Sequence, residues 1–389
     1  MSKRAAGRVP KKHILEGCSL DLATDAMEMP LSWGAYPSSS RDDRKLNKIV
    51  PHDVIEIDDD DDQDEVLVIG EFLSSRIKRQ TVKTMNVSKN VIKKPILIID
   101  DDTDVKCQAF KQFDTVRDSS DHHFNKPEIL KMTPAIKEQP GKNWVKRIQH
   151  EWKVLEKDLP ETIYVRIFED RMDILRAVII GPAGTPYHDG LFFFDIYFPP
   201  TFPLVPPMVH YHSGGLRLNP NLYQCGKVCL SLLNTWPGQG CETWNSSNST
   251  ILQVLVSIQA LVLNAKPYFN EPGFELSVNT PYGRKESLAY NETAFILSCK
   301  TMLYSLRKAP KHFEEFVAGH FRSKGSEILE ACIAYMKGAQ VGCVFVNGVR
   351  DVDSSDKSSS SAFKENLSTI YDQLVMEFTG KGTLSDKLS

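Results

Sequence analysis

The order of apolar patterns between residues 142 and 337 most constrains how this chain can fold. Trp144, Ile148 and Leu155 recur at helical spacing, and Pro160 ends that helix. Four runs rich in β-branched and aromatic residues then predict strands at 163–168, 174–180, 191–198 and 208–211. After an irregular segment, helices are predicted over 251–264 and 286–308, with shorter ones through Lys337. This order predicts an α+β domain with an N-terminal helix, a four-stranded antiparallel meander and C-terminal helices packed on one side of the sheet.

The flanking regions differ from this core in composition. Residues 1–135 hold polar clusters and an acidic run, and their large apolar residues are too sparse to build a core, which predicts a long disordered acidic extension. A folded domain is expected over 142–321, with additional helices over 322–347. A Ser-rich linker at 348–363 leads to an amphipathic helix and tail over 364–389.

Composition narrows the classes of function. The net charge of −3 gives no overall attraction to nucleic acid or membrane, and no stretch approaches a membrane span. No positively charged start followed by an apolar run marks a secretory signal, so we expect an intracellular protein, cytoplasmic or nuclear. The eight cysteines are then expected to be reduced thiols without a disulfide framework. A reduced compartment permits thiol chemistry.

The irregular segment carries the candidate chemistry, in the run NPNLYQCGKVCLSLL from Asn219 to Leu233. Cys229 precedes apolar residues that would anchor its backbone while leaving the sulfur at the surface. A thiolate nucleophile needs a donor for the oxyanion of its tetrahedral intermediate, and the amide of Asn221, eight residues earlier, is a candidate. No His or Asp stands at a position that marks a triad partner, although such partners can be remote in sequence.

Other interpretations of these residues stay open at this point. A lone cysteine is usually a small buried hydrophobe, and an Asn such as Asn221 often caps a turn. Cys225, Cys229 and Cys241 could be imagined as zinc ligands, but no nearby His or second cysteine pair supports such a site. We therefore expect no metal.

Several separated motifs resemble the ubiquitin-conjugating enzyme family. The family signature is His-Pro-Asn with a cysteine eight residues after the Asn, and here Asn219-Pro220-Asn221 precedes Cys229 at that spacing. Other motifs match in order within roughly 142–321, namely Gly181-Pro182, Pro186 to Gly190, Phe198-Pro199, Phe202-Pro203 and Pro206-Pro207. The Asn-Pro-Asn form is closest to a large-chain subgroup that includes the giant inhibitor-of-apoptosis conjugating enzymes and the conjugating–ligase hybrids. That subgroup also shares the loop Pro267 to Gly273 and the stretch Tyr290-Asn291-Glu292.

The resemblance implies a ubiquitin-conjugating fold and a role for each matching residue. Cys229 would form the thioester with ubiquitin, and Asn221 would stabilise the oxyanion when an acceptor lysine attacks. Asn270 and Glu271 fall where the family keeps polar residues near the thioester. They would help desolvate or deprotonate the lysine, whose pKa is otherwise about 10.4. Ser231 stands two residues after the cysteine, where many members carry an acid.

The chain also departs from the family pattern. Asn219 replaces the signature His, and Cys225 stands where an acidic or polar residue is more usual. Leu204 falls where many members present a Phe to a RING-type ligase, and the loop over 235–248 is longer. These departures bear on the ligase partner rather than on thioester formation.

The resulting prediction is an aminoacyltransferase that accepts ubiquitin from an activating enzyme and passes it to lysines of substrate proteins, with or without a ubiquitin ligase. It needs no cofactor of its own, since the activating enzyme uses the ATP. The alternatives are conjugation of another ubiquitin-like protein, and a SUMO-binding scaffold. Val54–Ile57 and Ile96–Ile99 precede acidic residues and resemble SUMO-interacting motifs, while solvated acidic linkers share that composition.

Overall fold

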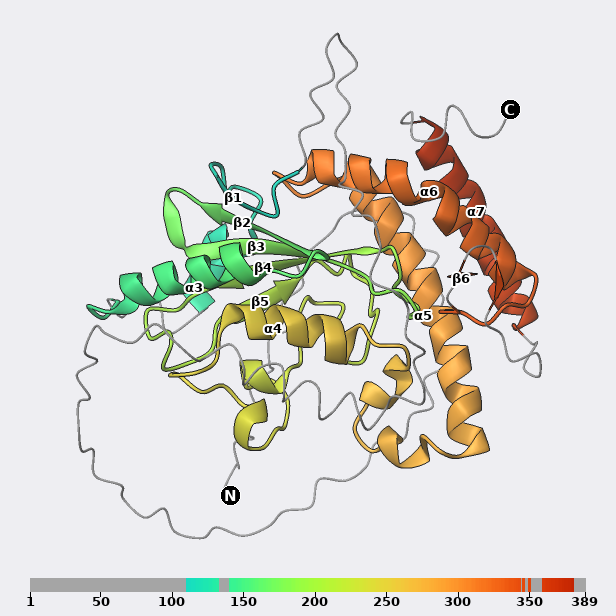
Figure 1. Cartoon of the computed structure of the whole chain (residues 1–389), viewed down its shortest axis with the longest axis horizontal. Coiled ribbons are helices and arrows are strands. Elements are labelled where there is room, and N and C mark those ends of the chain that lie inside the picture. Colours follow the sequence, from blue (N-terminus) through green and yellow to red (C-terminus); the bar gives the residue numbers. More distant parts are fainter. Residues whose placement is uncertain (1–109, 133–139, 344, 347–348, 351–358, 381–389) are drawn as a thin grey trace, which may run out of the picture. The chain divides into compact units, whose positions relative to one another are not determined.

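The computed structural model describes residues 110–132, 140–343, 345–346, 349–350 and 359–380. Both candidate SUMO-interacting motifs therefore lie outside the described residues, as do 1–109 of the expected extension and most of the Ser-rich linker. Figure 1 shows helix α3 (Trp144–Asp158) at one end of a sheet and helices α5 to α7 at the other. Among the described helices, none combines the length and hydropathy that crossing a bilayer requires.

The sheet has five strands in the order β1-β2-β3-β4-β5. The four predicted strands form the expected antiparallel meander, with bounds Ile163–Phe168 (β2), Arg171–Ile180 (β3), Leu191–Tyr197 (β4) and Met208–Tyr211 (β5). The fifth strand, β1 (Phe113–Val116), pairs with β2 in parallel and was not predicted. Its four residues include Asp114 and Thr115, so they carry no apolar alternation long enough to reveal a strand.

The expected N-terminal extension ends earlier than residue 135. Strand β1 lies inside that range, and so do the 3-10 helix η1 (His123–Asn125) and helix α2 (Pro127–Met132). These elements are held by single buried or half-buried side chains, such as Phe113 against the main core and Phe124 against Phe168 of β2. Such isolated contacts do not produce a periodic pattern, which is why composition alone extended the boundary too far.

Helices cover both faces of the sheet rather than the one face expected. One apolar cluster joins Leu175, Ala177 and Ile179 of β3 to α3 and to α4 (Ile251–Ser257). A second cluster begins on the opposite face, with Val178 of β3 and Phe193 of β4, and continues into α5, α6 and α7. All seven residues of β4 are buried. Burial of every residue of the strand, with Asp195 as its one charged member, indicates that both faces are covered.

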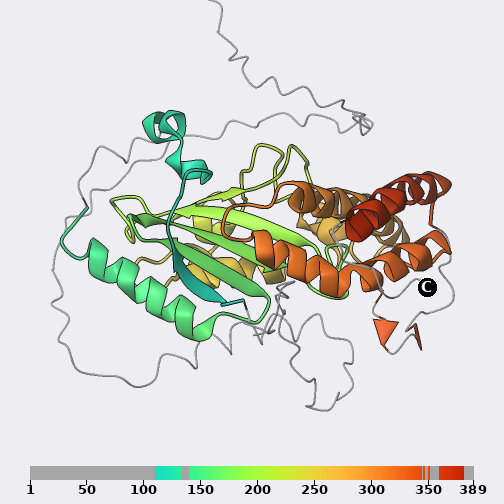
Figure 2. The same ribbon diagram turned by 90° about the horizontal axis from the view of Figure 1, so that it is seen from above.

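Two long helices build most of the second cluster, and Figure 2 shows their ribbons from above. Helix α5 (Pro281–Arg307) begins five residues before the expected start, because the Thr280 side chain accepts a hydrogen bond from Gly283 N at 2.9 Å and Pro281 occupies the first turn. Helix α6 (Glu314–Met336) runs without a break across the expected boundary between 321 and 322. The expected domain over 142–321 and the additional helices are therefore continuous.

The last helix, α7 (Ser361–Gly380), packs against α5 and α6. The predicted amphipathic face is present, with Leu367, Ile370, Leu374 and Phe378 buried in the second cluster. The start of α7 is fixed to α5, since Ser360 N and Oγ donate to the Glu292 carboxylate at 3.2 and 2.9 Å. The second apolar cluster is therefore incomplete without α7.

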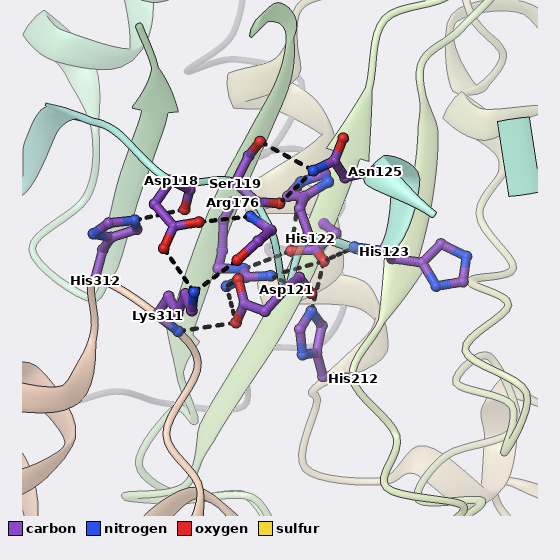
Figure 3. Close-up of polar contacts among 12 residues, drawn as sticks. Asp118, Ser119, Asp121, His122, His123, Asn125, Arg176, His212, Lys311 and His312 are labelled. Atoms are coloured by element: carbon purple, nitrogen blue, oxygen red, sulfur yellow. Dashed lines mark hydrogen bonds and ion pairs between the residues drawn. The ribbon is translucent and has the colours of Figure 1, made fainter. Parts of the chain in front are cut away.

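A buried charge network fastens the segment after β1 to the same face of the sheet (Figure 3). Arg176 of β3 is fully buried, and its guanidinium donates to Asp195 Oδ1 at 2.6 Å and to both carboxylate oxygens of Asp121 at 2.9 Å. Lys311, between α5 and α6, donates to Asp118 at 2.6 Å. Residues nearly two hundred positions apart in the sequence are thus joined in one network, here called the clasp. The buried charged side chains of the clasp all have partners.

Histidines in this clasp make stability depend on pH. His123 stacks on His210 with ring centroids 3.4 Å apart, and burial lowers the pKa of His123 to about 4 and of His210 to about 3. As pH falls below about 6.5, the two histidines become protonated in the unfolded chain but stay neutral in the folded protein. The free energy of unfolding therefore falls between about pH 6.5 and 4. Each histidine adds a slope of up to about 1.4 kcal/mol per pH unit.

Chemical unfolding at several pH values between 7.5 and 4.5 checks this expectation. The His210→Gln variant should lose part of the slope, while His150→Gln, an exposed position on α3, should keep all of it. Equal slopes in the two variants would contradict the assignment to the clasp.

Candidate active site

The segment around Cys229 folds into a tight hairpin. Cys229 N donates to Asn221 O at 2.9 Å, Leu222 and Val228 form an antiparallel bridge, and Tyr223 N donates to Lys227 O at 3.0 Å. Gly226 closes the turn at φ +86°, where a Cβ would lie 2.0 Å from the His210 ring. Residues 221 and 229 are therefore opposite each other, and so are 223 and 227.

This pairing decides which side chains share a face. In an antiparallel pair, opposite residues point to the same side and successive residues alternate. Leu222 and Val228 are buried in the main apolar cluster. The other face, here called the thiol face, consists of Asn221, Tyr223, Lys227 and Cys229.

Cys229 is nearly covered, so the expectation that its sulfur is left at the surface is wrong. Its residue exposure is 2%, yet it belongs to neither of the two large apolar clusters, although Val228 and Leu230 on either side do belong to the main one. Burial raises the pKa of its thiol, while Lys227, a hydrogen-bonding interaction with the Tyr223 hydroxyl and Arg217 each lower it. Lys227 and Arg217 are themselves exposed.

Asn221 lies beside the cysteine as the sequence predicts. It is 7% exposed, and its Nδ2 donates to the Cys229 backbone carbonyl at 2.9 Å. Its Oδ1 has no hydrogen-bond partner among the described residues. The Asn221 amide therefore holds the backbone carbonyl of Cys229.

Asn219, in place of the signature His, is a fully buried structural hub. Its Nδ2 donates to the Tyr187 hydroxyl and to Val262 O, both at 2.8 Å, and its Oδ1 accepts from Asn221 N at 2.8 Å. Asn270 joins this hub, since its Nδ2 donates to Val262 O at 3.1 Å and lies 3.5 Å from Asn219 Oδ1. The structure thus gives Asn270 partners in the hub rather than at the thiol.

Glu271 is connected to the thiol face through Arg217. The Arg217 guanidinium lies 3.8 Å from the Glu271 carboxylate and 4.7 Å from the centre of the Tyr223 ring. Lys227 Nζ lies 5.7 Å from the same ring. Arg217 therefore links Glu271 to the Tyr223 ring of the thiol face.

Ser231 points to the following loop. It begins a 3-10 helix (Ser231–Leu233), and its Oγ donates to Pro237 O at 2.9 Å. Of the predicted site residues, the structure brings Asn221 next to Cys229, while Glu271 contacts Arg217 and both Asn270 and Ser231 have other partners. Sequence reasoning missed Tyr223, Lys227 and Arg217. The first two could have been found from their even spacing to Cys229 in a hairpin, but Arg217 approaches only through the fold.

Comparisons with known proteins agree on one family. The family model described as "Ubiquitin-conjugating enzyme" matches residues 147–295. The chain is 56% identical over 274 residues to the Arabidopsis thaliana "Probable ubiquitin-conjugating enzyme E2 26", which covers 70% of this chain and 49% of the relative. It is 55% identical over 273 residues to "Putative ubiquitin-conjugating enzyme E2 38" of the same plant, covering 70% of this chain and 82% of the relative.

A human relative is longer by far. The "Dual E2 ubiquitin-conjugating enzyme/E3 ubiquitin-protein ligase BIRC6" is 43% identical over 203 residues, covering 50% of this chain and 4% of the relative. The chain thus spans about half the length of the first Arabidopsis relative, most of the second and a small part of the human protein.

Proposed function

This chain belongs to the ubiquitin-conjugating enzyme family, and we propose that it accepts ubiquitin as a thioester on Cys229 and transfers it to lysines of substrate proteins. The observation that carries the proposal is the hairpin in which Cys229 stands opposite Asn221, with cationic side chains at its thiol face. The ubiquitin would come from an ATP-dependent activating enzyme, so this chain's own chemistry needs no cofactor.

The proposed reaction has two steps. The Cys229 thiolate attacks the thioester carbonyl carbon of ubiquitin on the activating enzyme, a new carbon–sulfur bond forms, and the activating enzyme's thiolate leaves. A substrate lysine amine then attacks the same carbon, a carbon–nitrogen bond forms, the Cys229 thiolate leaves, and the amine loses a proton to solvent or to a base. Both steps pass through an oxyanion that requires a hydrogen-bond donor.

Asn221 is the proposed oxyanion donor, because its Nδ2 already lies next to the reacting residue. Glu271 is proposed to receive the lysine ammonium, since its carboxylate lies near the thiol face and can exchange Arg217 for another cation. For Asn270 the contacts support an indirect role, holding the hub that positions Asn221. A role for Ser231 in lysine positioning stays a prediction without a supporting contact.

The charging assay tests the proposal. Incubation with activating enzyme, ATP and ubiquitin should give an adduct that thiols cleave, and Cys229→Ser should give a thiol-resistant ester instead. The exposed Cys225, four residues earlier, is the matched control, and Cys225→Ser should keep the labile adduct. Transfer of the labile adduct to Cys225, or no adduct with any modifier, would reject the proposal.

A panel of modifiers in the same assay separates ubiquitin from other ubiquitin-like proteins. The SUMO-binding alternative is tested separately, by pulldown on immobilised SUMO with the residues of Ile96–Ile99 changed to Ala. Loss of binding in that variant would support the SUMO-binding scaffold, and no binding by the unaltered chain would reject it.

A further inference from the structure

Helices α6 and α7 lie beyond residue 295, where the match to the family model ends. They nevertheless contact a loop inside the matched region, residues 181–190 between β3 and β4, here called the β3–β4 loop. Tyr335, near the end of α6, is fully buried, and its hydroxyl lies 3.0 Å from His188 Nε2. His320, also on α6, has its Nε2 2.8 Å from Asp189 O. Two side chains of α6 therefore hold two successive residues of this loop.

The partners of His188 assign the direction of each of its hydrogen bonds. Its Nδ1 lies 2.8 Å from a carboxylate oxygen of Asp189, which accepts, so Nδ1 donates. Gly342 N donates to the Tyr335 oxygen at 3.1 Å, which leaves the hydroxyl proton of Tyr335 for His188 Nε2. The Tyr335 hydroxyl thus joins the β3–β4 loop to the segment that follows α6.

These contacts hold a backbone conformation that is otherwise unfavourable. Asp189 has φ +61°, in the left-handed region that residues with a side chain rarely adopt. Such a conformation persists only where the surrounding structure holds it. Here the holding contacts come from His188 and from His320 of α6. Without them, we expect the β3–β4 loop to relax.

The same loop carries one end of the Asn219 hub. Tyr187 directly precedes His188 and is fully buried, and its hydroxyl accepts a hydrogen bond from Asn219 Nδ2 at 2.8 Å. Asn219 Oδ1 in turn accepts from Asn221 N at 2.8 Å. A series of buried hydrogen bonds, joined by the peptide link between Tyr187 and His188, therefore runs from α6 to the residue beside Cys229.

We propose that His188 and Tyr335 are positioning residues, through which the C-terminal helices hold the Asn219 hub in the arrangement that lets Asn221 donate to the oxyanion. The inference rests on the proposed thioester chemistry of Cys229 and on the proposed role of Asn221. Both residues act on the reaction only through the hub. A small displacement of Asn221 weakens a hydrogen bond that forms in the transition state, so the maximal rate of discharge falls while the lysine concentration needed does not change.

The Tyr335→Phe variant tests the proposal, because it removes only the hydroxyl that reaches His188. Ser305→Ala is the matched control, since it removes another buried hydroxyl, one that donates to Thr301 O at 3.0 Å within α5. A second pair of variants changes the loop side of the contact. His188→Leu removes the acceptor, and His188→Gln restores one at about the position of Nε2.

Hydrogen exchange followed by mass spectrometry on the uncharged full-length protein is the first measurement. In Tyr335→Phe, peptides from the β3–β4 loop and the peptide with Asn221, whose N–H donates to Asn219, should exchange about three- to tenfold faster. Strand β2 should exchange as in wild type, and Ser305→Ala should leave all these peptides unchanged. Wild-type exchange of the loop and of the Asn221 peptide in Tyr335→Phe would overturn the proposal.

Single-turnover discharge to free lysine is the second measurement. Tyr335→Phe and His188→Leu should lower the maximal discharge rate about three- to tenfold, with the half-saturating lysine concentration unchanged. His188→Gln should recover most of the rate, and charging should stay within about twofold of wild type in every variant. Added to Asn221→Ala, which already lacks the donor, Tyr335→Phe should slow discharge by less than about twofold.

A wild-type discharge rate in Tyr335→Phe would contradict the proposal. Equal slowing by Tyr335→Phe with and without Asn221 would contradict it too, because the hydroxyl would then act by a route other than the hub. Failure of the wild-type protein to form any adduct would instead reject the proposed function. The exchange measurement needs no ubiquitin, so it decides separately whether Tyr335 holds the hub.

Discussion

Replacing Asp195 with Ala should lower the free energy of unfolding by about 3–5 kcal/mol, because it leaves a buried arginine without its partner. Both Asp195 and Arg176 are fully buried, and the carboxylate accepts from Arg176 Nε at 2.6 Å and from His123 N at 2.7 Å. His212 Nε2 also lies 2.9 Å from Oδ2. Burial alone would raise the pKa of Asp195, but these neighbours hold it well below its usual range.

Denaturant unfolding measures this change, and the chain supplies a matched control. Arg171 and Asp173 form an equally short ion pair at 2.7 Å, but their side chains are 26% and 28% exposed. Asp173→Ala should therefore cost only about 0–1 kcal/mol. If the two variants lose equal stability, burial does not decide the strength of these pairs, and the clasp is not the anchor described above.

Replacing Asn221 with Ala should slow the discharge of ubiquitin to lysine about a hundredfold, since loss of one oxyanion donor costs about 3 kcal/mol of barrier. Charging should be affected less, because the activating enzyme can supply its own donors to the first oxyanion. The variant also removes the donor to the Cys229 carbonyl, so thermal stability must be measured alongside discharge.

Single-turnover discharge to free lysine provides the measurement. Asn248→Ala, an exposed asparagine in the remote loop before α4, is the control and should discharge at the wild-type rate. Near-normal discharge in Asn221→Ala would reject its proposed role. An equal loss of charging and discharge together with lowered stability would assign Asn221 to the hairpin alone.

Local sequence signals predicted the elements that have strong periodicity. Strands β2 to β5 and helix α3 follow directly from runs of β-branched residues and from helical spacing. Strand β1 was not predicted, because its stability comes from pairing with β2, about fifty residues away, and from Gln112, which donates to Ile163 O at 3.0 Å. The contacts that stabilise β1 are made by other segments, so the four residues of the strand do not reveal it.

The candidate site shows the same difference between local contacts, which the sequence predicted, and long-range contacts, which it did not. Cys229 and Asn221 were predicted because their contact depends on a spacing of eight residues within one hairpin. The contact of Arg217 with Tyr223 depends on how a preceding loop returns to the hairpin, which no linear pattern specifies. Asn270 was expected near the thioester, but its side chain faces the Asn219 hub. The direction of a side chain in a 3-10 turn such as this one is set by tertiary contacts.

The position of α7 has a consequence for how the protein is made. Helices α5 and α6 emerge from the ribosome well before Leu367, Leu374 and Phe378 of α7. In the folded protein these three side chains cover the apolar faces of the two helices. Until those residues emerge, a nascent chain that already contains all five strands of the sheet exposes the apolar faces of α5 and α6 to other nascent chains and to chaperones. Cotranslational maturation of this domain therefore waits for its last helix, and premature termination before α7 should leave an aggregation-prone product.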